Sequence, residues 1–194
     1  MKVVGITGGI GSGKSVVCQI FSRLGAPVYE SDKVVHLFYE KYPEINERIK
    51  NEISEEAFDK NGKIVRKKLG EIVFADSKKL GILNKIVHPY VKIDFEKWLK
   101  NYKGNPYIIK EAAILFESGA SDSCDKIIAV ISPLELRISR VKERDHKSKA
   151  EIDLIVGKQM NDEELILRSD FVIYNDEKQL LIPQVLKIHG VLIK

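Results

Sequence analysis

The stretch GITGGIGSGKSVV, residues 5–17, limits the possible folds of this chain more than any other part of the sequence. It places five glycines, one lysine and two serines between two apolar patterns. Gly8, Gly13, Lys14 and Ser15 satisfy G-x-x-x-x-G-K-[ST], the phosphate-binding P-loop pattern. A β-branched run at residues 2–7 predicts a strand before the loop, and an apolar stripe after Lys14 predicts a helix behind it.

A glycine-rich loop in this context can bind phosphate. Glycines allow the loop to turn successive backbone N–H groups into one concavity, and the following helix adds its free N–H groups and positive dipole end. We expect Lys14 to contact the β and γ phosphates of ATP and the Ser15 hydroxyl to ligate Mg²⁺. The alternative is a tightly packed turn without a ligand, which the complete pattern disfavours. The nucleotide-binding residues predicted in this segment are Gly8, Gly11, Ser12, Gly13, Lys14, Ser15 and Val16.

Composition excludes several other classes of protein. The 194 residues, 44% hydrophobic and 31% charged, fit one soluble domain with an insertion. No apolar run approaches the about eighteen residues of a membrane span, and the first residues do not resemble a secretory signal. The two cysteines are far apart, so we expect free thiols in a reducing compartment and a cytoplasmic protein. The net charge of +4 equals the excess of six basic over two acidic residues between 137 and 149, which suits a small polyanion better than nucleic acid.

Short apolar runs separated by helical patterns predict an α/β fold with a five-stranded parallel sheet. The strands expected after the first are at 28–30, 107–109, 126–131 and 171–174. We predict a nucleotide-binding core from residues 1–32, 105–136 and 166–194, a helical insertion at 33–104 and a mobile lid at 137–165.

Local signals predict where several helices begin and end. The dipeptide His88-Pro89 predicts a break between helices. Ser132 and Glu135 predict a capping box, as do Ser148 and Glu151 for a helix that runs to Met160. The C-terminal helix is either kinked or begun by its proline at 183.

A P-loop alone does not distinguish kinases from GTPases or large ATPases. The N-K-x-D element typical of guanine recognition is incomplete at residues 84–87, and the DKNG stretch at 59–62 is better interpreted as a turn. The chain is too short for the sensor elements of large ATPases. We therefore favour a small-molecule kinase.

Phosphoryl transfer also needs carboxylates and further positive charge. Glu30 and Asp32 follow the second predicted strand and Glu111 ends the third, at the sheet edge where such folds bind ligands. Asp32 is the candidate base, or else caps the helix after Lys33. Glu111 could hold the metal through water, or else is a solvated strand-end carboxylate.

Three arginines at helical spacing provide the candidate positive charge. The spacing i, i+3, i+7 predicts one helix face that carries Arg137, Arg140 and Arg144. The packed face is expected to carry Leu134, Ile138 and Val141. Such an arginine stripe suits a lid that closes over phosphates, although most charged runs are solvated surface.

Several stretches together resemble the dephospho-CoA kinase family over nearly the whole chain. They are GITGGIGSGKS, GAPVYESDKVVH, LNKIVHPYV, IIKEAAILFESG, SRVKERD, KQM and SDFVIYND. The chain departs from the family pattern where Glu30 and Glu111 replace aspartates, Ala113 replaces proline and Val16 replaces threonine.

The resemblance implies a P-loop kinase three-layer sandwich with an acceptor-binding helical domain and a lid. It implies transfer of phosphate from ATP, with Mg²⁺, to the ribose 3′-hydroxyl of dephospho-CoA, the last step of coenzyme A synthesis. Catalytic roles fall on Asp32, Lys14 and Arg140. Nucleotide contacts extend to Arg144 and Asn175, and acceptor contacts fall on Asp32, His88 and Glu111. We expect no membrane or nucleic-acid partner, and a monomer or weak homo-oligomer.

Two other classes remain open from the residues alone. A nucleoside monophosphate kinase would share the core, insertion and lid, but would not need a carboxylate base. A nucleotide-dependent binding switch would hold or hydrolyse nucleotide without transferring phosphate.

Overall fold

The structure, a computed structural model, describes residues 1–194, which form two compact units. The sheet unit contains residues 1–30 and 100–194, and the helical unit contains residues 31–99. The helical insertion was predicted at residues 33–104, with residues 31 and 32 assigned to the core. The segment 137–165, predicted to be a lid, belongs to the sheet unit by its contacts.

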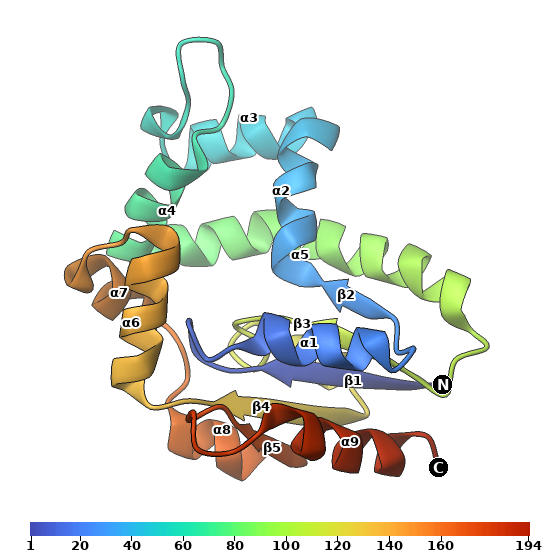
Figure 1. Cartoon of the computed structure of the whole chain (residues 1–194). Coiled ribbons are helices and arrows are strands. Elements are labelled where there is room, and N and C mark those ends of the chain that lie inside the picture. Colours follow the sequence, from blue (N-terminus) through green and yellow to red (C-terminus); the bar gives the residue numbers. More distant parts are fainter. The chain divides into compact units, whose positions relative to one another are not determined.

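The sheet unit is built on five parallel strands in the order β2-β3-β1-β4-β5 (Figure 1). This confirms the predicted α/β class. The strands are β1 (Lys2–Thr7), β2 (Val28–Glu30), β3 (Tyr107–Glu111), β4 (Lys126–Ile131) and β5 (Phe171–Tyr174). Because every strand runs in the same direction, all carboxyl ends share one edge, and the glycine loop leaves the central strand there.

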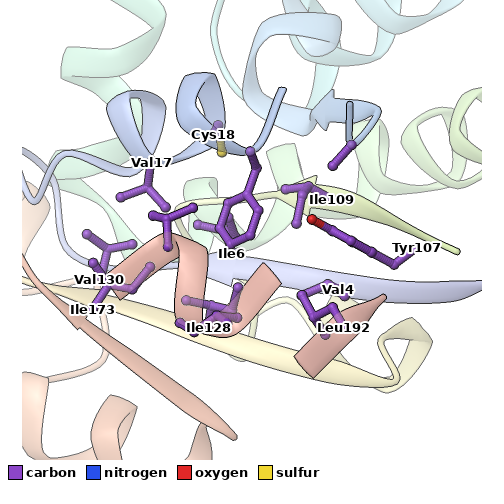
Figure 2. Close-up of a cluster of buried hydrophobic side chains, with 14 residues drawn as sticks. Val4, Ile6, Val17, Cys18, Tyr107, Ile109, Ile128, Val130, Ile173 and Leu192 are labelled. Carbon is purple, nitrogen blue, oxygen red and sulfur yellow. The ribbon is translucent and has the colours of Figure 1, made fainter. Parts of the chain in front are cut away.

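Helices cover both faces of the sheet. On one face, α1 (Lys14–Arg23) and α9 (Leu181–Leu192) pack on the larger apolar cluster, drawn in Figure 2. That cluster includes Val4, Ile6, Val17, Cys18, Tyr107, Ile109, Ile128, Val130, Ile173 and Leu192. On the other face, α8 (Asp162–Arg168) places Leu165 against β4. Burial on both faces explains why the strands read as nearly continuous apolar runs.

The helical unit has a core of its own. Its helices are α2 (Ser31–Lys41), α3 (Pro43–Glu52), α4 (Arg66–Ala75) and α5 (Ser77–Leu99), with a short 3₁₀ turn η1 (Glu55–Ala57). Its fully or nearly fully buried side chains include Phe38, Ile45, Ile49, Leu69, Val73 and Ile86. The predicted turn at 59–62 is present, with the Gly62 N–H donating to the Asp59 carbonyl over 3.0 Å. Neither this unit nor the sheet unit has a helix long and apolar enough to cross a membrane.

The remaining elements lie in the sheet unit. They are the helices α6 (Leu134–Asp145) and α7 (Lys149–Val156) and the 3₁₀ turns η2 (Lys100–Tyr102) and η3 (Ala120–Ser123). The capping box predicted for α7 is confirmed, but α7 ends at Val156 rather than Met160. The box predicted for α6 is wrong, because the Ser132 hydroxyl accepts a hydrogen bond from Arg140 instead. Pro183 lies in the first turn of α9, where its missing N–H costs no hydrogen bond.

The predicted helix break at His88-Pro89 is wrong, because α5 continues through Pro89. A proline inside a helix removes one backbone hydrogen bond. Packing on both sides of the proline offsets that cost, since Ile86 and Val87 are buried before it and Phe95 after it. Tyr90 also donates a hydrogen bond to Glu44 of α3 over 3.2 Å.

Asp170, directly before β5, links this strand to β4 by hydrogen bonds, and we expect its substitution to lower stability. Its carboxylate accepts from the Lys126 ammonium over 2.6 Å and from the Ile127 N–H over 2.8 Å. Burial opposes the charge, but these hydrogen bonds outweigh it and lower the pKa of Asp170. We expect Asp170→Asn to reduce the free energy of unfolding by about 1–2 kcal/mol at neutral pH, measured by urea denaturation.

The pH dependence of that difference follows from the direction of the shift. A depressed folded-state pKa gives stability that is present above the unfolded-state value, about 3.9 for aspartate, and lost as the pH falls through the folded value. The wild-type advantage over Asp170→Asn should therefore shrink below about pH 4. Asp153→Asn, at an exposed helix pair, is the control. An equal loss from that control would contradict the assignment to Asp170.

Candidate active site

The glycine loop is supported by a residue from a distant part of the chain. Gly13 has a φ of 96°, a left-handed conformation that disfavours other residues. A Cβ at Gly13 would also collide with the Asn175 side-chain amide. That amide donates to the Ser12 carbonyl over 2.8 Å, so the segment after β5 supports the loop directly. The structure thus brings Asn175, predicted near the nucleotide, to the loop.

Lys14 begins α1 and folds back over the loop. Its ammonium donates to the Gly8 carbonyl over 2.9 Å and to the Gly9 carbonyl over 3.4 Å. The cation therefore lies against the backbone of the glycine loop itself. Ser15 and Val16 follow it as exposed residues of the first turn of α1.

Arg140 of α6 contacts three segments of the sheet unit. Its guanidinium donates to the Ser132 hydroxyl over 3.0 Å and to the Glu177 carboxylate over 3.1 Å. Longer contacts reach the Asn175 carbonyl at 3.4 Å and the Gly11 carbonyl at 3.5 Å. Arg140 is therefore placed beside the loop, with the segments that follow β4 and β5.

The connection between α7 and α8 also touches the loop, through a residue absent from the predicted site. Gln159 accepts from the Ile10 N–H over 2.7 Å and donates to the Ala113 carbonyl over 3.3 Å. Next to it, the Met160 N–H donates to the Glu117 carboxylate over 2.7 Å. These bonds explain why α7 stops early, because the chain leaves the helix to reach the loop.

The three arginines of α6 do not share one environment, contrary to the sequence interpretation. Arg137 is buried together with Ile138 and Val141, whereas Leu134 is 42% exposed. Arg144 is exposed at the end of α6 and bonds Asp145 over 2.7 Å, which lowers the pKa of Asp145. The packed face of the helix is thus rotated from the predicted one, and it includes an arginine.

Two carboxylates lie side by side at the carboxyl edge of the sheet. Glu30 ends β2 and Glu111 ends β3, and the two are direct partners in the parallel register. Glu111 is only 8% exposed, so its interpretation as a solvated strand-end carboxylate is wrong. No group of three or more histidine, cysteine or acidic side chains forms a complete metal site.

Asp32 and His88 belong to the helical unit. Asp32 lies in the first turn of α2, which begins at Ser31, directly after β2 ends. The capping alternative required Asp32 to precede the helix, so that alternative is wrong. His88 lies in the middle of α5.

A parallel sheet whose central strand leads through this loop and lysine into a helix defines a P-loop fold, which solved kinases share. A solved shikimate kinase from Acinetobacter baumannii has this fold, with a TM-score of 0.53 at 13% identity. The profile of the dephospho-CoA kinase family matches residues 2–180. The chain therefore belongs to the dephospho-CoA kinase family, ATP-using kinases that carry out the final step of coenzyme A biosynthesis.

Curated and solved relatives agree with this assignment. A dephospho-CoA kinase from Fusobacterium nucleatum is 42% identical over 176 residues, covering 91% of this chain and 90% of the relative. One from Bacteroides fragilis is 41% identical over 185 residues, covering 95% and 90%. A solved dephospho-CoA kinase from Campylobacter jejuni is 27% identical with a TM-score of 0.66, covering 97% of this chain and 95% of that chain. A crystal structure from Thermus thermophilus is 30% identical with a TM-score of 0.85, covering 98% and 96%.

Proposed function

We propose that this chain transfers the γ-phosphoryl group of ATP to the ribose 3′-hydroxyl of dephospho-CoA, giving coenzyme A and ADP. The observation that carries the proposal is the glycine loop after β1, shaped by Asn175 and crossed by Lys14, in a chain of this family. In the reaction, the acceptor oxygen forms a bond to the γ phosphorus as the bond to the ADP oxygen breaks. The hydroxyl proton passes to a base, and ADP leaves with the bridging electron pair.

The loop and Lys14 bind the triphosphate in this proposal. The residues in contact with nucleotide are Gly8, Gly11, Ser12, Gly13, Lys14, Ser15 and Val16. Lys14 exchanges its contacts with the Gly8 and Gly9 carbonyls for phosphate oxygens. Because the ammonium starts on the loop itself, this exchange needs only a side-chain rotation.

The donor set at this edge fits Mg²⁺. Ser15 offers a hydroxyl oxygen, and Glu30 and Glu111 offer carboxylate oxygens, which are the hard ligands that Mg²⁺ prefers. Mg²⁺ usually retains waters and shares its remaining sites with substrate phosphates. A site of few protein ligands therefore suits it, and Ser15, Glu30 and Glu111 would hold the ion. When bound, the ion neutralises charge on the phosphates.

Asp32 accepts the proton of the acceptor hydroxyl. A carboxylate is the base that a hydroxyl acceptor requires, whereas a phosphate acceptor is already ionised. Asp32 is two residues beyond the end of β2, and its helix carries it into the unit proposed to bind dephospho-CoA. His88 and Glu111 complete the proposed acceptor contacts.

Arg140 and Arg144 supply positive charge to the transferring phosphoryl group. Arg140 is already beside the loop, bonded to Ser132 and Glu177. Arg144 is exposed at the end of α6, in the segment 137–165 proposed to act as a lid. Closure of such a lid would exclude water and strengthen both contacts.

An acceptor panel tests the proposed reaction. ADP release is measured with Mg·ATP and dephospho-CoA, AMP, CMP, UMP, dTMP or no acceptor. We expect acceleration by dephospho-CoA alone, with coenzyme A identified by mass spectrometry. Acceleration by a monophosphate, or an equal rate without acceptor, would contradict the proposal. Size-exclusion chromatography with light scattering tests the proposed monomer or weak homo-oligomer.

A further inference from the structure

Arg137 is a buried cation in contact with the glycine loop. The residue is 7% exposed, although it lies on α6 in a strongly charged segment. A Cβ at Gly9 would collide with one terminal nitrogen of its guanidinium. The guanidinium therefore lies directly against the backbone of Gly9, a position of the phosphate-binding pattern.

The backbone of Arg137 touches the loop as well. A Cβ at Gly11 would come within 2.5 Å of the Arg137 carbonyl oxygen. The side chain thus packs on Gly9 while the main chain packs on Gly11, on either side of Ile10. The Ile10 N–H is itself held by Gln159. Three consecutive loop residues are in this way enclosed by α6 and the segment before α8.

Asp162, the first residue of α8, is the counter-charge of Arg137. The guanidinium and the Asp162 carboxylate are 3.6 Å apart, and the two side chains are 9% and 26% exposed. Burial raises the pKa of Asp162, and the Arg137 charge opposes that rise. The Arg137 Nε is buried with no hydrogen-bond partner. An unpaired buried donor is costly, so an arginine kept there for packing alone would be a poor choice.

We propose that Arg137 is a positioning residue for ATP binding. By its contacts with Gly9 and Gly11 it holds residues 9–11 of the loop in the shape that binds phosphate. Asp162 in turn fixes the position of the Arg137 guanidinium. The inference rests on the proposed binding of ATP by this loop. Arg137 is separate from Arg140, which lies beside Gly11 with the segments after β4 and β5. In its buried position it adds a full positive charge close to the N–H groups that receive the phosphates. Water screens that charge poorly there.

The test compares Arg137→Gln, Asp162→Asn and the double variant with the wild type. Titration calorimetry with Mg·ATP should give about a tenfold higher Kd for Arg137→Gln, the size expected when a charge-assisted contact is lost. Asp162→Asn should raise Kd by a smaller factor. The double variant should match Arg137→Gln, because Asp162 acts only through the arginine. At saturating ATP, kcat should stay within about threefold of the wild type, since Arg137 does not contact the reacting atoms.

Amide hydrogen exchange provides a readout without nucleotide. In Arg137→Gln, the amides of Ile10, Gly11 and Ser12 should exchange faster, while those of β1 remain unchanged. Lys142→Gln, an exposed residue of the same helix, is the matched control and should alter neither measurement. Arg137→Lys, which retains charge without the planar fork, should recover only part of the affinity. It also serves if Arg137→Gln fails to fold.

Two results would overturn the inference. One is an ATP affinity of Arg137→Gln or Arg137→Lys equal to that of the wild type. The other is an effect of Asp162→Asn that adds in full to that of Arg137→Gln. If the wild type itself failed to bind Mg·ATP, the proposed function would fail instead, so the two failures are distinguishable.

Discussion

Asp32→Asn is expected to lower kcat with dephospho-CoA by about 10²–10⁴-fold, the contribution of a positioned general base. The Kd for Mg·ATP should stay within about twofold of the wild type, because the loop and Lys14 are unchanged. The asparagine keeps the size of the side chain but cannot accept the hydroxyl proton. Single-turnover phosphoryl transfer and calorimetry measure the two quantities separately.

Two further variants make the Asp32 result specific. Glu40→Gln removes another exposed carboxylate of α2 and should leave kcat unchanged. Asp32→Glu retains a base with a longer reach and should recover part of the rate. A rate for Asp32→Asn close to that of the wild type would remove Asp32 from the mechanism.

Lys14→Met should reduce kcat/KM for ATP by at least about 10³-fold, since one preorganised charge at the phosphates is commonly worth that much. Unlike the Asp32 variant, it should also weaken ATP binding, because Lys14 contacts phosphates before as well as during transfer. Methionine keeps an unbranched chain of similar length, so the variant isolates the charge. Steady-state kinetics and calorimetry with Mg·ATP are the measurements.

The free protein supplies the control for Lys14. In the absence of nucleotide, Lys14 donates to the carbonyls of Gly8 and Gly9, which are buried residues of the loop. We therefore expect the free energy of unfolding to fall by no more than about 3 kcal/mol, the upper range for a hydrogen bond to a charged group. A large loss of stability would mean that Lys14 supports the loop rather than the nucleotide. Lys14→Arg keeps the charge on a bulkier group, so its kcat/KM for ATP should lie between those of the wild type and Lys14→Met.

Much of the sheet unit could be predicted, because its signals are local. The apolar runs of β1, β4 and β5 are bounded by the residues that the sequence indicates. The P-loop pattern is contiguous, so its seven predicted residues lie together in the structure. The pairing of Glu30 with Glu111 follows from two strand ends that meet at one edge, although their burial does not.

The errors arise where distant contacts outweigh local preference. Pro89 favours a helix break, but the core of the helical unit packs on both sides of it. Ser132 favours a helix cap, but Arg140, eight residues later, takes its hydroxyl. Periodicity indicated that Leu134 was packed and Arg137 was not, because a hydrophobicity pattern cannot anticipate a buried arginine paired with a partly buried Asp162. Gln159 was also missed as a loop contact, since its partner Ile10 is 149 residues away.

The chain passes from the sheet unit to the helical unit between residues 30 and 31 and returns between residues 99 and 100, which has an evolutionary consequence. Residues 31–99 leave and rejoin the sheet unit through two peptide bonds and bring their own apolar centre. Such a unit can change in sequence, lengthen or be replaced while the glycine loop of the sheet unit stays intact. Asp32, the proposed base, lies in this unit. Replacement of the unit would therefore change the acceptor specificity and the base together.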